Sequence, residues 1–228
     1  MTAFPEIASR VSANLAGLED ALAQFADTLS LSKEWVQREW LLSTNNVARP
    51  LLLGAKVTLL EAGTAWAIGS NRGAASSLRA YVENVFAWLY YKDHPVEFRV
   101  VEMGRGDLML PKGVQGYFKQ VDYGFERAYL ELVKQSSRGK DDEYYYSAIS
   151  QFVHAHPTFN RLSGKIHELA VSSPRDASFL KLCQKADEFI SDNFAACYRG
   201  SWDDAPNVVK MNILDRLKAK TKDFLAVT

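Results

Sequence analysis

The sequence predicts an all-α protein, a single-domain bundle of seven or eight helices. Apolar residues recur at steps of three and four residues over most of the chain, which is the period of an amphipathic helix. No segment alternates apolar and polar residues for long enough to predict a strand. Clusters of glycine, proline and serine separate the periodic segments, as at helix ends, and no repeat of about 20 to 50 residues occurs.

The composition indicates a folded globular protein. The chain has 228 residues, 47% of them hydrophobic and 24% charged, which is enough for a sizeable core. Its 27 basic and 27 acidic residues cancel, so no overall charge favours nucleic acid or an anionic membrane. Two cysteines are too few for a disulfide scaffold. Without a leader pattern or a stretch long enough to span a bilayer, we expect a cytoplasmic protein with no membrane partner.

Three helices are predicted before residue 70. The first spans residues 4–29, and serines near residue 30 can cap a second helix that carries Trp35 and Trp40. Pro50 fits the first turn of a third helix, which runs to about residue 68. The apolar face of this third helix consists of Leu53, Val57, Leu60 and Ala67.

Residues 76–95 form the most apolar stretch and are predicted to be the central helix. Apolar and aromatic residues cover it nearly all round, which is typical of a buried helix. It nevertheless carries Arg79 and Glu83 one turn apart, and charges that enter a core need partners. These two residues can pair with each other, Arg79 can pair with a carboxylate of another helix such as Glu61, or both can line a functional pocket.

The second half of the chain continues the helical pattern. Residues 96–102 fit a short helix or an extended piece, and four glycines with Pro111 predict a loop over 104–116. Helices are expected over about 114–133, 141–156, 176–198 and 206–225. The poor periodicity of 158–174 predicts a loop. Residues 175–228 either complete the single domain or form a helical appendage to it.

The spacing of metal ligands and nucleophiles disfavours several chemistries. Cys183 and Cys197 lie near no histidine and fall on an apolar helix face, where cysteine behaves as a small hydrophobe. His154 and His156 would diverge by about 200° on a helix. No phosphate-binding loop and no Gly-x-Ser-x-Gly elbow are present. We therefore predict neither a metal nor a cofactor.

The histidine region offers a more specific chemistry. Tyr146, Ser150 and His154 are spaced four apart, so they share one helix face, and Arg161 and His167 follow. An arginine with a histidine is the combination that metal-independent ribonucleases use. The imidazole transfers the proton of the ribose 2′-hydroxyl and the guanidinium stabilises the charged phosphorane. His154 also suits an ordinary structural role near the carbonyl end of its helix.

The order of these motifs resembles a known group of proteins. A Gly-Ser-Asn-Arg-Gly loop at 69–73 precedes Arg79-x3-Glu83, and Tyr146-x3-Ser150-x3-His154 follows later. This order is similar to that of uncharacterised prokaryotic helical proteins allied to the HEPN-like and abortive-infection families. The similarity covers about residues 52–157. Ile149 stands where leucine usually precedes the serine, and the Arg-Asn-x-x-x-His motif of HEPN ribonucleases is absent.

The resemblance implies a bundle that commonly dimerises and a role in phage defence or toxin-like RNA cleavage. It also implies that Arg79, Glu83, Ser150 and His154 converge on a cleft. On this hypothesis His154 transfers the proton, Arg79 or Arg161 stabilises the phosphate, and the partners are RNA, a second copy of the chain and an antitoxin or other protein. Two alternatives stay open: a non-catalytic protein-interaction module, and a small-molecule sensor with a pocket between helices.

Overall fold

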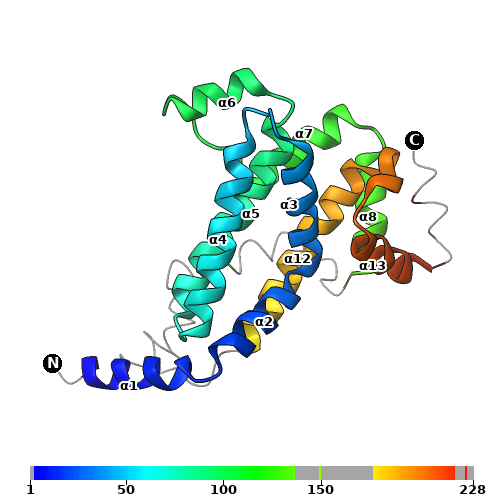
Figure 1. Cartoon of the computed structure of the whole chain (residues 1–228). Coiled ribbons are helices and arrows are strands. Elements are labelled where there is room, and N and C mark those ends of the chain that lie inside the picture. Colours follow the sequence, from blue (N-terminus) through cyan, green and yellow to red (C-terminus); the bar gives the residue numbers. More distant parts are fainter. Residues whose placement is uncertain (1–2, 137–148, 150–176, 219–223, 225–228) are drawn as a thin grey trace.

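The computed structural model describes residues 3–136, 149, 177–218 and 224. Within these ranges the chain forms helices and turns without a strand (Figure 1), which confirms the all-α prediction. The described residues contain eleven helices, one of them a 3-10 helix, so the expected count of seven or eight was wrong. In the same ranges, no helix is long and apolar enough to cross a bilayer.

Eight helices precede residue 137 and three follow residue 176 in the described part of the chain (Figure 1). Proline occupies one of the first two positions of α4, α6 and α7, where its missing N–H breaks no helical hydrogen bond. The helices are α1 (Ala3–Leu15), α2 (Leu18–Thr28), α3 (Ser30–Leu42), α4 (Arg49–Ala67), α5 (Asn71–Tyr91), α6 (Pro95–Glu102), α7 (Pro111–Val121), α8 (Phe125–Lys134), α12 (Ala177–Cys197), η1 (Arg199–Asp204) and α13 (Asn207–Leu217).

Local turns raise the number of helices. The predicted helix 4–29 is divided at Gly17, whose φ of 70° is left-handed and is adopted by glycine without steric cost. The predicted helix 114–133 is divided between α7 and α8, where Asp122 Oδ1 accepts a hydrogen bond from the Gly124 amide at 3.1 Å. Apolar periodicity continues through both breaks, so it does not reveal them.

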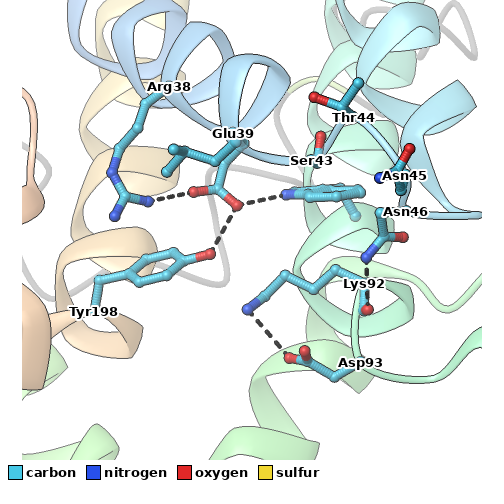
Figure 2. Close-up of a pocket in the computed structure, with 11 residues that line it drawn as sticks. Arg38, Glu39, Ser43, Thr44, Asn45, Asn46, Lys92, Asp93 and Tyr198 are labelled. Carbon is cyan, nitrogen blue, oxygen red and sulfur yellow. Dashed lines mark hydrogen bonds and ion pairs between the residues drawn. The ribbon is translucent and has the colours of Figure 1, made fainter.

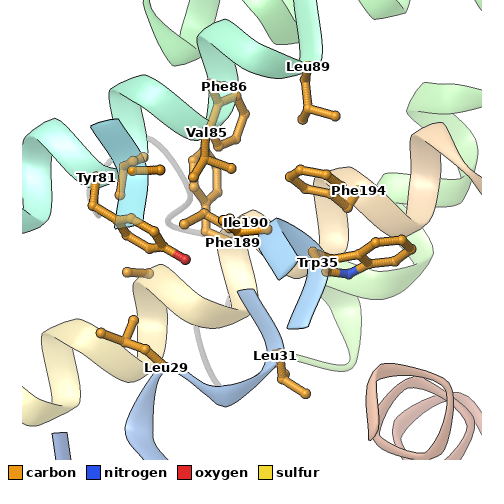
Figure 3. Close-up of a cluster of buried hydrophobic side chains, with 14 of the residues drawn as sticks. Leu29, Leu31, Trp35, Tyr81, Val85, Phe86, Leu89, Phe189, Ile190 and Phe194 are labelled. Carbon is orange, nitrogen blue, oxygen red and sulfur yellow. The ribbon is translucent and has the colours of Figure 1, made fainter. Parts of the chain in front are cut away.

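The prediction of a buried central helix is confirmed for residues 76–91, but the helix begins at Asn71, within the expected loop at 69–73, and ends at Tyr91. Helix α5 packs along α4 and also contacts α7 and α12, and α12 is buried to a similar degree. Figure 3 shows side chains of α5 meeting those of α12 and α3. The ring centroids of Phe86 and Phe189 lie 4.9 Å apart, and those of Trp35 and Phe194 lie 5.2 Å apart. Aromatic packing thus joins α3, α5 and α12 into one core.

Of the face predicted for α4, only Ala67 is buried. Leu53, Val57 and Leu60 are exposed, Leu60 to 72%. The buried face combines Leu52 and Trp66 with small residues such as Gly54 and Gly63. A Cβ added at Gly54 would lie 3.2 Å from the Asn84 amide of α5, and one added at Gly63 would lie 2.9 Å from Phe25 of α2. The close approach that these glycines allow brings many atoms into van der Waals contact, which favours the face that contains them.

Candidate functional site

Arg79 and Glu83 form an ion pair within α5. Arg79 Nε donates to Glu83 Oε1 at 2.8 Å, and the side chains are 26% and 25% exposed. Of the arrangements that the sequence left open, the structure shows the pairing within one helix. Glu61 lies exposed on α4 and takes no part in this pair. Ion pairs at this spacing on a helix surface contribute about 0.3–0.5 kcal/mol.

The other predicted site residues, Ser150, His154 and Arg161, lie outside the described residues. Their convergence with Arg79 and Glu83 therefore stays a prediction. One residue of this region is described: Ile149 is helical, fully buried and part of the hydrophobic core. The position at which the resemblance expects leucine is thus a core position, and the chain directly before Ser150 is attached to the bundle.

An open pocket of about 610 Å³ lies where the C-terminal ends of α3 and α5 meet Tyr198, between α12 and η1 (Figure 2). None of its residues is among the site residues predicted from the sequence. The lining consists of Arg38, Glu39, Leu42, Ser43, Thr44, Asn45, Asn46, Trp88, Lys92, Asp93 and Tyr198. We call it the Glu39 pocket.

The Glu39 carboxylate joins three helical segments in the wall of this pocket. Glu39 is 5% exposed. Its Oε1 accepts from Arg38 Nη1 at 2.5 Å, and its Oε2 accepts from Trp88 Nε1 at 3.0 Å and from the Tyr198 hydroxyl at 2.8 Å. These three donors offset the cost of burying the charge. Burial and the nearby Glu39 charge raise the pKa of Tyr198 far above its ordinary value, so its hydroxyl stays a donor.

Two cations contact the ring of Tyr198. Arg38 Cζ and Lys92 Nζ each lie 4.9 Å from its centroid, a contact worth about 0.5–2 kcal/mol depending on exposure. Arg38 Nε also donates to the Asp204 carbonyl at 2.8 Å. Lys92 Nζ pairs with Asp93 at 3.1 Å. Positive charge from α3 and from the end of α5 is therefore held close to one aromatic ring.

A second buried carboxylate, Asp187 of α12, caps α3. No side chain at the N-cap position of α3 caps that helix. Instead, Asp187 accepts from the Leu31 amide at 3.1 Å, the Ser32 amide at 2.7 Å and the Ser32 hydroxyl at 2.6 Å. These amides belong to the first turn, whose N–H groups have no partner within the helix. Burial raises the pKa of Asp187 to about 6.

Metal and thiol chemistry find little support in the described residues. Over those ranges, no group of three or more His, Cys, Asp and Glu side chains is placed to hold a metal ion. Burial raises the pKa of both Cys183 and Cys197. Both thiols therefore stay protonated at neutral pH and are poor nucleophiles.

The Glu39 pocket escaped sequence reasoning because its residues come from three distant segments and form no short motif. One signal was available in α3. Glu39 lies one turn after Trp35 and so shares the face of a buried tryptophan. A charge on a buried face needs partners, and this criterion would have singled out Glu39.

Comparisons of the chain with protein-family models, with curated proteins and with solved structures found no match.

Proposed function

We propose that this chain is a HEPN-like helical protein of defence or stress type that cleaves RNA without a metal ion. The half-buried Arg79–Glu83 pair on the central helix α5 carries the proposal, because the resemblance puts an arginine and a glutamate at this spacing. Charged groups held partly out of water cost desolvation, and apolar side chains of similar volume often stabilise a helix contact equally well. A charged pair at such a position is a candidate functional group.

The burial of Ile149 supports the same proposal, since it attaches the chain directly before Ser150 to the core that contains α5. In the proposed reaction the ribose 2′-oxygen attacks the adjacent phosphorus and His154 takes its proton. The bond from phosphorus to the 5′-oxygen breaks, and that oxygen leaves with a proton from water. Arg79 stabilises the charge on the phosphorane, and Glu83 orients its guanidinium.

Incubation of single-stranded RNA with the purified protein in EDTA tests the proposal. The wild type should cut the RNA and leave 2′,3′-cyclic phosphate ends, whereas His154→Ala should not. His156→Ala is the matched control, because it removes a histidine two residues away and should leave cleavage intact. Equal survival of RNA with the wild type and with His154→Ala contradicts the proposal, as does cleavage that EDTA abolishes.

A small-molecule sensor is the second candidate function, and the Glu39 pocket favours it. A volume of about 610 Å³ lies within the range of small-molecule sites, about 300–1,000 Å³. Three helical segments meet in its wall, so an occupant would contact α3, α5 and the end of α12 together. Binding should therefore raise the melting temperature of the whole bundle.

A further inference from the structure

The acceptors in the lining of the Glu39 pocket are largely engaged within the protein. The Glu39 carboxylate receives three hydrogen bonds. The carbonyl of Lys92 accepts from Asn46 Nδ2 at 2.9 Å, and Asn46 Oδ1 accepts from the Ala48 amide at 2.9 Å. The carbonyls of Glu39 and Ser43 accept from loop amides at 3.0 Å each. Apart from the exposed Asp93 carboxylate, a ligand that brings mainly donors would find few charged acceptors.

Donors, by contrast, remain in excess. Arg38 uses Nε and Nη1 in hydrogen bonds, and no residue in the described ranges engages its Nη2. The ammonium of Lys92 has one carboxylate partner, Asp93. The Ser43 hydroxyl is buried without a partner in the same ranges, and it can donate as well as accept, as can the Thr44 hydroxyl and the Asn45 amide. This lining matches a ligand that is rich in acceptors.

The charged side chains of the pocket lining also favour a ligand that is rich in acceptors. Arg38 and Glu39 compensate each other at 2.5 Å. Lys92 is 20% exposed, whereas its partner Asp93 is 65% exposed, so water screens the negative charge more than the positive one. Figure 2 shows the Arg38 guanidinium beside Glu39 and the Lys92 ammonium below Glu39, both near Tyr198. An anion at this point would meet two cations held by the same ring.

From this geometry we infer that the Glu39 pocket binds a small organic anion, a carboxylate or a phosphate monoester, whose charged group lies between Lys92 and Arg38. The polar turn of residues 43–46 contacts the remainder of the ligand. This inference gives the sensor candidate its ligand class and rests on it, and it is independent of RNA cleavage.

Isothermal titration calorimetry of the full chain with four probes tests the inference: inorganic phosphate, adenosine monophosphate, glutarate and neutral adenosine. Adenosine monophosphate should bind, and adenosine should bind at least tenfold more weakly. Phosphate and glutarate distinguish the two kinds of anion. Lys92→Met should lower the affinity for adenosine monophosphate about tenfold or more, because it removes a charge-assisted hydrogen bond, and Lys92→Arg should retain it.

Lys56→Met is the matched control, since the Lys56 ammonium lies 4.9 Å from the Trp40 ring outside the pocket lining. It should change the affinity less than twofold. Circular dichroism melting verifies that each variant is folded. Two results would overturn the inference that the ligand is an anion: unchanged affinity in a folded Lys92→Met variant, or equal affinity for adenosine and adenosine monophosphate. The sensor candidate would survive either result. Failure of all four probes to bind at millimolar concentration overturns both.

Discussion

Replacing Asp187 with asparagine should remove a pH dependence from the stability of the protein. The carboxylate is 3% exposed, and burial raises its pKa from 3.8 to about 6. Between these values the folded state holds a proton that the unfolded state releases. The free energy of unfolding therefore falls as the pH rises through this window. At 1.36 kcal/mol per unit of pKa difference, the loss amounts to about 3 kcal/mol by pH 7.

Asparagine cannot titrate, so its contribution stays constant over this range. Its single carbonyl oxygen replaces two carboxylate oxygens, which receive hydrogen bonds from Leu31 and Ser32. One backbone amide of α3 then loses its acceptor, at a cost of about 1–3 kcal/mol. Other titrating groups are common to both proteins and cancel in the difference. The wild type should lose about 2.5 kcal/mol relative to Asp187→Asn between pH 4 and pH 7.

Urea unfolding at pH 4, 5, 6 and 7 measures this difference, with tryptophan fluorescence as the signal, because Trp35 is fully buried beside Phe194. Asp215→Asn, an exposed position on α13, is the control and should follow the wild type at every pH. A difference that does not change with pH refutes the reasoning. A wild type that gains stability relative to the variant as the pH rises would show that the hydrogen bonds from α3 outweigh burial.

Two further substitutions test the packing of the bundle. Glu39→Ala should lower the free energy of unfolding by about 3–5 kcal/mol, because it leaves Arg38, Trp88 and Tyr198 without their shared acceptor. Chemical denaturation measures this loss, with Glu34→Ala on the same helix as a control that should cost less than about 0.5 kcal/mol; equal effects at both positions would contradict the assigned role of Glu39. Gly63→Ala should destabilise by about 1–3 kcal/mol, since its Cβ would lie 2.9 Å from Phe25. Gly116→Ala on α7 is the control, because its new Cβ would meet no atom within 4 Å. It should stabilise the protein by about 0.5–1 kcal/mol. If the two variants shift the melting temperature in the same direction, α4 and α2 do not approach as closely as Gly63 and Phe25 indicate.

The helical fold and its buried centre could be predicted because they depend on local pattern. The period of apolar residues in 76–95 identifies α5 whatever surrounds it. The buried face of α4 could not be predicted in this way. Leu53, Val57 and Leu60 are large and apolar, yet they are exposed, whereas Leu52 and Trp66 on the other side are buried. The choice between two apolar faces depends on how closely Gly54 and Gly63 let the neighbouring helices approach, which no single-helix pattern contains.

The candidate sites likewise include features that the sequence predicts and features that depend on tertiary contacts. The sequence by itself determined the all-α class, the buried helix and the spacing that lets Arg79 pair with Glu83, because residues four apart on a helix are always neighbours. Only the tertiary structure decided that Asp187 caps α3 and that Glu39 binds Trp88 and Tyr198. These partners lie 155, 49 and 159 residues apart. Contacts over such separations exist only once α3, α5 and α12 have packed together, and packing depends on the shapes of all three helices at once.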